Sequence, residues 1–196
     1  MTSTAVVPRR EQLLEAAAQL FSARGFHAVG IDDIGAAAGI SGPGVYRHFA
    51  SKHALLESLC DRAMTRMLDG AEQIIATAGD PYTALESLVD LHVAFAVSER
   101  ALIGVWIREA RSLSEDVRQS LRRRLRAYEQ LWLQVLGVLR DDLEPAQVAI
   151  VSGSTLAMLN GTAFTTPVVG PAEQARLLRR MALSALLVRR TPARRA

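Results

Sequence analysis

Apolar residues recur at a spacing of three or four along most of the chain, and no segment alternates apolar and polar residues as a strand does. The first stripe is expected to place Leu13, Ala17 and Phe21 inward on a helix that Gly25 ends. A second, shorter stripe is expected to end at Gly39. The pattern therefore predicts an all-α fold.

Further helix starts are predicted where a capping residue or a proline precedes an apolar stripe. In chain order these are Ser41, Ser51, Asp80, Ser114, Pro145 and Pro171. The helix after Ser51 is expected to run to about residue 78, and the helix from Pro171 through Leu187. The last two helices are apolar on nearly every face, so we expect them to be covered, in part by the same helices of a second copy.

Composition narrows the class of protein without naming a function. The net charge of +3 and the pI near 9.6 are only mildly basic. Cys60 is the only cysteine, which excludes an internal disulfide and a cysteine-based zinc site. Residues 1–10 lack the apolar core of a signal peptide, and the uncharged stretch 145–172 is too polar and too rich in proline to span a membrane. These features predict a soluble cytoplasmic protein with no membrane contact.

The stretch "IDDIGAAAGISGPGVYRHFASK", residues 31–52, combines two short helical patterns with a glycine turn. Such an arrangement is typical of a helix-turn-helix, in which the second helix enters the major groove of DNA. Ile34, Ile40 and Val45 would face inward and set the angle between the helices. Ser51 and Lys52 would offer a hydroxyl and a positive charge at a helix start, where a phosphate can bind.

In this stretch the chain resembles the TetR family of bacterial transcriptional regulators. The matching residues are Gly25, Phe26, Ile34, the run Ala37-Ala38-Gly39-Ile40-Ser41, the run Val45-Tyr46-Arg47-His48-Phe49, Lys52 and Leu55. The resemblance implies a DNA-binding domain over residues 1–54 and a helical ligand-binding and dimerisation domain over residues 55–190, followed by a disordered tail over residues 191–196.

The resemblance also implies which residues contact DNA. Tyr46, His48 and Lys52 would bind the backbone, and Arg47 would reach a guanine edge. The expected DNA-binding set is Ser41, Gly42, Gly44, Tyr46, Arg47, His48 and Lys52. Tyr46 could also pack against the first helix, and a solvated surface position is the alternative for His48.

Two positions depart from the family pattern. Gly30 replaces the usual Thr or Ser cap, which removes one expected phosphate contact. Gly35 stands where the family favours alanine, at a cost in helix propensity. Gly42, Pro43 and Gly44 present almost no side chain to the bases, so direct readout would depend on Arg47, with help from Tyr46 and Ser41.

In the later helices, a few polar and aromatic side chains lie on otherwise apolar faces. The family binds small molecules among these helices, and such sites combine apolar walls with a few polar groups. The expected ligand-binding set is Leu88, His92, Trp106, Tyr128, Trp132 and Asn160. An ordinary core with satisfied hydrogen bonds is the alternative for each. For the arginines over residues 118–126 a solvated, salt-bridged face is favoured over a second DNA contact, which stays open for them and for the Arg-rich tail.

These observations favour a ligand-responsive transcriptional regulator, a repressor rather than an activator. It would bind palindromic double-stranded operator DNA as a homodimer and be released by a small hydrophobic effector, without cofactor, metal or catalytic residues. No nucleophile elbow, metal-binding histidine pair or phosphate loop points to an enzyme. The alternative is a helical small-molecule-binding or scaffolding protein with a weak or vestigial DNA-binding hairpin.

Overall fold

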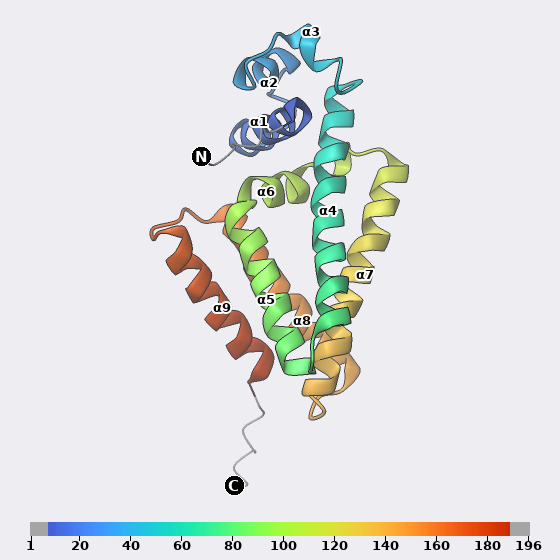
Figure 1. Cartoon of the computed structure of the whole chain (residues 1–196), viewed down its shortest axis with the longest axis vertical. Helices are drawn as coiled ribbons and strands as arrows, with labels where there is room; N and C mark the ends of the chain where they lie inside the picture. The colour runs from blue at the N-terminus through green and yellow to red at the C-terminus, as the bar shows by residue number, and fades with distance from the viewer. Residues whose placement is uncertain (1–7, 189–196) are drawn as a thin grey trace, which may run out of the picture. The chain divides into compact units, whose positions relative to one another are not determined.

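The computed structural model describes residues 8–188, and these residues form helices and connecting turns without a strand (Figure 1). The all-α prediction is confirmed. The α-helices are α1 (Arg9–Arg24), α2 (Ile31–Ala37), α3 (Gly42–Val45), α4 (Lys52–Thr77), α5 (Pro81–Ser98), α6 (Arg100–Glu109), α7 (Glu115–Leu139), α8 (Pro145–Asn160) and α9 (Pro171–Leu187). Two short 3₁₀ helices, η1 (Ala110–Ser112) and η2 (Gly161–Phe164), follow α6 and α8.

The helix ends follow from local chemistry. Gly25 ends α1 at a φ of 83°, a backbone conformation that costs glycine nothing. The hydroxyl of Ser51 accepts a hydrogen bond from the backbone N–H of Ala54 at 3.0 Å, and Asp80 caps α5 through Tyr82 and Thr83. Ser114 also precedes its helix as expected, but its hydroxyl donates to Glu57 at 2.6 Å instead of capping α7.

The chain divides into two compact units. The first unit comprises the residues up to Met64 together with Ala101–Leu121, and the second comprises Thr65–Arg100 together with the chain from Arg122 onward. This division differs from the expected single boundary after residue 54, because α6 and the segment between it and α7 add Leu102, Val105 and Leu113 to the core of the first unit. The expected disordered tail, residues 191–196, lies outside the described residues.

The core of the first unit is apolar and fully buried. Leu13 and Phe21 of α1 meet Ile34 of α2, Val45 of α3 and Leu55 of α4 in one cluster. These are the positions that the helical spacing predicts to face inward, and burying each large apolar side chain stabilises the fold by roughly 1.5–3 kcal/mol. The core therefore fixes the orientation of the short helix α3.

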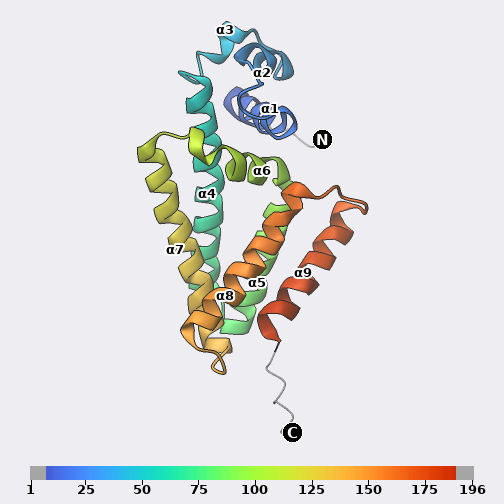
Figure 2. The ribbon, with the colours of Figure 1, turned by 180° about the vertical axis from the view of Figure 1, so that it is seen from behind.

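The second unit is built around α5, α8 and α9, which lie side by side in both views (Figures 1 and 2). Arg179 of α9 donates to Glu86 and Asp90 of α5 at 2.8 and 2.7 Å. Arg140, at the end of α7, is buried and donates to the backbone carbonyl of Leu186 at 2.8 Å. Within the described chain, no helix has both the length and the apolar character to cross a membrane.

Candidate nucleic-acid interface and buried polar cluster

The turn between α2 and α3 is unusually tight, and two glycines make it so. The N–H of Ile40 reaches back to the carbonyl of Gly35 at 2.9 Å, and Gly39 adopts a φ of 70°. A β-carbon on Gly35 would lie 2.9 Å from the carbonyl oxygen of Ile40 and 3.1 Å from the nitrogen of Gly42. Glycine therefore stands at position 35 because the backbone of the turn passes too close for alanine, which outweighs its poor helix propensity.

The side chains expected to contact DNA from α3 and its C-terminal turn face solvent. Ser41, Arg47 and His48 are exposed, and Tyr46 is 56% exposed, so packing of Tyr46 against the first helix does not occupy most of its ring. Val45 and Phe49, which stand before and after the run 46–48, are buried in the core. Gly42 is buried and Gly44 is half-buried.

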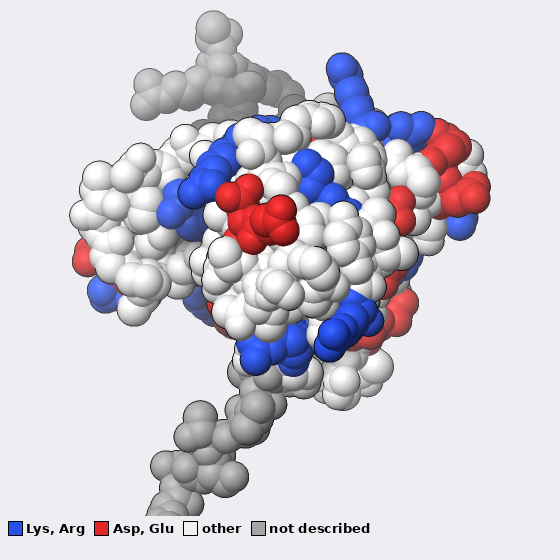
Figure 3. All heavy atoms as spheres, turned by 90° about the horizontal axis from the view of Figure 1, so that it is seen from above, with Lys and Arg blue, Asp and Glu red and all other residues white. Residues whose placement is uncertain are grey.

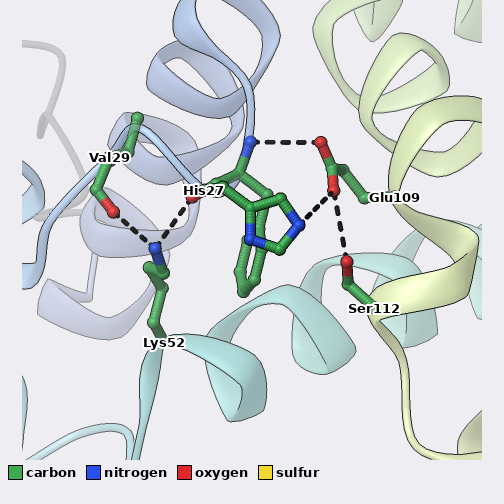
Figure 4. A network of polar contacts seen from close by, with 6 residues as sticks. His27, Val29, Lys52, Glu109 and Ser112 are labelled. Atoms are coloured by element: carbon green, nitrogen blue, oxygen red, sulfur yellow. Dashed lines mark hydrogen bonds and ion pairs between the residues drawn. The ribbon is translucent and has the colours of Figure 1, made fainter.

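Lys52 does more inside the protein than the sequence suggests. Its ammonium donates to the backbone carbonyls of Phe26 at 2.8 Å and Val29 at 2.7 Å (Figure 4). It also lies 4.5 Å from the centre of the Phe26 ring, a cation–π distance. Lys52 thereby holds the loop between α1 and α2 against the start of α4, and uses two of its three ammonium N–H groups to do so.

Glu109 of α6 fastens the same loop from the other side (Figure 4). Its carboxylate accepts hydrogen bonds from the backbone N–H of Phe26 at 3.1 Å and from the Ser112 hydroxyl at 3.3 Å, and it lies 4.0 Å from Nε2 of His27. Its neighbour Arg108 donates to the carbonyl of Ser22 at 3.0 Å. The sequence reasoning missed these contacts, because Glu109 and Phe26 are 83 residues apart and carry no local signal.

Neither sign of charge dominates the face of the molecule shown in Figure 3. On the face shown in Figure 3, groups of basic side chains alternate with acidic ones. Arg24 and Asp33, for example, form an ion pair at 3.6 Å. Binding of a polyanion by this unit would therefore depend on the direction of a few side chains and not on bulk charge.

A buried polar cluster lies in the second unit. Nδ1 of His92 is 2.8 Å from the hydroxyl of Tyr128, and Nε2 is 3.1 Å from Oδ1 of Asn160. Because the Asn160 oxygen only accepts, Nε2 carries the proton and Nδ1 accepts from the Tyr128 hydroxyl. The Trp132 ring packs edge-on to His92, with centroids 6.1 Å apart.

Burial keeps this cluster neutral. It lowers the pKa of His92 to about 4 and raises the pKa of the Tyr128 hydroxyl above its usual range. Desolvation is the main cause in both cases, since the charged form of either group would lose its hydration. At neutral pH the cluster offers neutral hydrogen-bonding groups and aromatic faces within an apolar interior.

The six residues expected to bind a ligand do not all meet. Leu88 is fully buried one turn before His92 on α5, in the second unit with Tyr128, Trp132 and Asn160. Trp106 instead packs against the core of the first unit. The prediction that one face of α6 is apolar is confirmed, but the sequence alone does not determine which of the two cores that face packs against.

Metal and redox chemistry find no support in the described residues. No group of three or more His, Cys, Asp or Glu side chains there could hold a metal ion. Cys60 is buried, and burial raises the pKa of its thiol to about 12, which suppresses the reactive thiolate.

Comparison with known proteins identifies the family. The family model for bacterial regulatory proteins of the tetR family matches residues 13–59, and a tetracyclin repressor-like C-terminal domain matches residues 78–164. The transcriptional repressor KstR2 of Mycolicibacterium smegmatis is 32% identical over 147 residues, which cover 69% of this chain and 70% of KstR2. The chain belongs to the TetR family of transcriptional regulators.

Other relatives agree with this placement. The transcriptional activator FasR of M. smegmatis is 38% identical over 87 residues, but the match covers only 44% of this chain and 40% of FasR. A TetR-family regulator from Bordetella parapertussis has the same fold, with a TM-score of 0.82 at 23% identity over 92% of this chain and 95% of that chain. The names of both curated relatives describe them as HTH-type regulators.

Proposed function

We propose that this TetR-family protein is a repressor that binds a palindromic operator as a homodimer and is released by a small hydrophobic effector. The observation that supports DNA recognition best is the exposure of Tyr46, Arg47 and His48 on a turn whose backbone is fixed by its own core. Arg47 reads a guanine edge with help from Ser41, while Tyr46, His48 and Lys52 contact phosphates. Gly44, which is half-buried, lets the helix approach the groove closely.

Competition binding to a selected operator tests this assignment. Arg47→Ala is expected to cost roughly 1–3 kcal/mol of discrimination at one base pair, because a bidentate arginine–guanine pair is lost. Arg111→Ala, at an exposed arginine of η1, is the matched control and is expected to leave the sequence preference intact. Full discrimination by Arg47→Ala would refute the role of Arg47 in base readout.

Dimerisation through α8 and α9 is supported by their exposed apolar side chains. Ile150 on α8 is 67% exposed, and Met181 on α9 is 50% exposed. Gly153 has no neighbouring atom within 4 Å of an added β-carbon, so a partner helix could approach it closely. Two copies of each helix would form a four-helix interface. This interface would set the spacing between the two recognition helices, α3 of each copy.

Light scattering during gel filtration tests the interface. Ile150→Glu should shift the protein toward a monomer, because it would bury an unpaired charge. Val138→Glu, at a side chain that is 65% exposed on α7, is the control and should remain dimeric. A wild-type monomer at micromolar concentration would contradict the proposal.

The proposed effector site is the buried polar cluster of the second unit, with Leu88, His92, Tyr128, Trp132 and Asn160. Neutral hydrogen-bonding groups among aromatic rings suit the polar end of an otherwise apolar molecule, such as a fatty-acyl or aromatic compound. The helix α4 contributes residues to both units, and so can carry a change in one to the other. Coupling of this kind is typically about 1–3 kcal/mol, a 5- to 150-fold loss of operator affinity.

A thermal-shift screen of fatty-acyl and aromatic compounds tests the effector site. Compounds that stabilise the wild type should lower its operator affinity, and His92→Phe should weaken their binding. Trp106→Ala, in the first unit, should bind them normally. Compounds that stabilise the protein without changing operator affinity would favour a DNA-binding protein without effector control. We propose no enzymatic activity, and turnover of any screened compound would revise that.

A further inference from the structure

The carboxylate of Asp32, on α2, lies against Gly42, the first residue of α3. A β-carbon built on Gly42 would lie 1.7 Å from Oδ1 of Asp32 and 2.9 Å from its Cγ. The Asp32 carboxylate thus fills the space beside the first residue of α3. Pro43 and Gly44, which follow, supply no hydrogen-bonding side chain.

The carboxylate lies in the first turn of α2, where a negative charge favours the helix N-terminus. The next residue, Asp33, accepts a hydrogen bond from the backbone N–H of Gly30 at 2.8 Å and pairs with Arg24. Asp32 is exposed and, within the described part of the chain, has neither a hydrogen bond nor an ion pair. Its position beside α3 is a cost for DNA binding in general, because phosphates repel a negative charge.

We infer that Asp32 is a specificity-determining residue that accepts a hydrogen bond from the N4 amino group of a cytosine in the operator. This inference rests on the proposed binding of DNA through α3. Cytosine is the one base whose major-groove edge offers a hydrogen-bond donor and no acceptor. Guanine and thymine present acceptors that would repel the carboxylate, and adenine sets an acceptor beside its donor. The negative charge of Asp32 therefore weakens binding to DNA in general but favours cytosine over the other bases at one position.

The contact between Asp32 and Gly42 allows a second, independent substitution to test the role of Asp32. Any side chain at position 42 must displace the carboxylate, because the overlap with Oδ1 is severe. Gly42→Ala keeps the charge of Asp32 but moves it. It should therefore lose the same cytosine preference that Asp32→Ala loses, although the two changes share no chemistry.

The experiment selects bound sequences from a random duplex DNA library and compares the enriched half-sites. The wild-type half-site should contain a cytosine for which Asp32→Ala loses about 5- to 150-fold in discrimination, the equivalent of roughly 1–3 kcal/mol. Asp32→Asn, which keeps the shape, should accept adenine there, since an amide pairs with both adenine groups. The charge-matched control Glu15→Gln, at an exposed residue of α1, should enrich the wild-type half-site.

Two outcomes overturn the inference in different ways. If the wild type enriches a palindrome and both Asp32 variants enrich it unchanged at every position, Asp32 does not read a base, while the proposed DNA binding stands. If the wild type enriches no motif, the proposed function fails and the inference fails with it. Circular dichroism melts of each variant establish folding, and Asp32→Asn supplies the decisive comparison should Asp32→Ala unfold.

Discussion

The polar side chains at the two candidate sites are bonded in different ways. In the first unit, charged groups bond to the backbone: Lys52 to two loop carbonyls and Glu109 to a loop N–H. In the second unit, the neutral ring of His92 is hydrogen-bonded to the side chains of Tyr128 and Asn160, and His92 and Tyr128 are buried. The first pattern immobilises the loop between α1 and α2, in the unit that contains the helix-turn-helix. The second joins side chains to side chains, so a ligand could replace one of the partners.

The largest expected effect concerns the tryptophans, one in each unit. Trp132 is fully buried in the second unit, so Trp132→Ala should lower the free energy of unfolding by roughly 3–5 kcal/mol. Trp106 is only partly buried against the first core, so Trp106→Ala should cost less. Urea unfolding followed by circular dichroism measures both, and equal losses would contradict the contrast.

The next effect is a pH dependence that belongs to the second unit. The pKa of His92 falls from 6.5 in the unfolded chain to about 4 in the folded protein, so the unfolded state alone binds a proton between these values. The contribution of neutral His92 to the free energy of unfolding is therefore fully present above pH 6.5. It is lost as the pH falls toward 4, by at most about 1.4 kcal/mol per pH unit.

Unfolding free energies at pH 7 and pH 5 isolate this contribution. Other groups also titrate in this range, so the relevant quantity is the difference between wild type and His92→Gln, which keeps hydrogen-bonding capacity but cannot ionise. The wild type should lose more stability than His92→Gln over the interval. Parallel losses in the two proteins would show that His92 ionises freely in the folded state.

Two glycines with opposite surroundings give the last contrast, and the change at Gly137 is the smallest effect. Gly35→Ala, in the first unit, should destabilise by roughly 1–3 kcal/mol, because its β-carbon meets backbone atoms. Gly137→Ala, in the second unit, should stabilise by about 0.5–1 kcal/mol, because that helical position is open. Thermal melts compare them, and a stabilising Gly35→Ala would mean that the turn relaxes readily.

Much of the fold was predictable from neighbouring residues. The starts of α5, α8 and α9 follow from Asp80, Pro145 and Pro171, and the end of α1 from Gly25. The exposure of Tyr46, Arg47 and His48 follows from helical periodicity within a recognised turn. In each case the deciding interaction lies within one or two helical turns, so the sequence contains it directly.

Two expectations needed the tertiary structure to be refined. Lys52 was expected at a phosphate, and two of its donors are bonded to Phe26 and Val29. Gly35 looked like a loss of helix propensity, and it is instead a requirement of the turn. Both features depend on contacts with the backbone of another segment. Helix propensity describes a residue within its own helix, so it does not predict such contacts.

By itself, then, the sequence determined which segments are helices, which of their faces are apolar, and which family the reading turn belongs to. The tertiary structure alone decided that Trp106 joins the first core while His92 meets Tyr128 and Asn160, at separations of 36 and 68 residues. The physical reason is that an apolar face can be buried against any other apolar face. Which faces meet depends on the packing of the whole set of helices and not on the local pattern of any one of them.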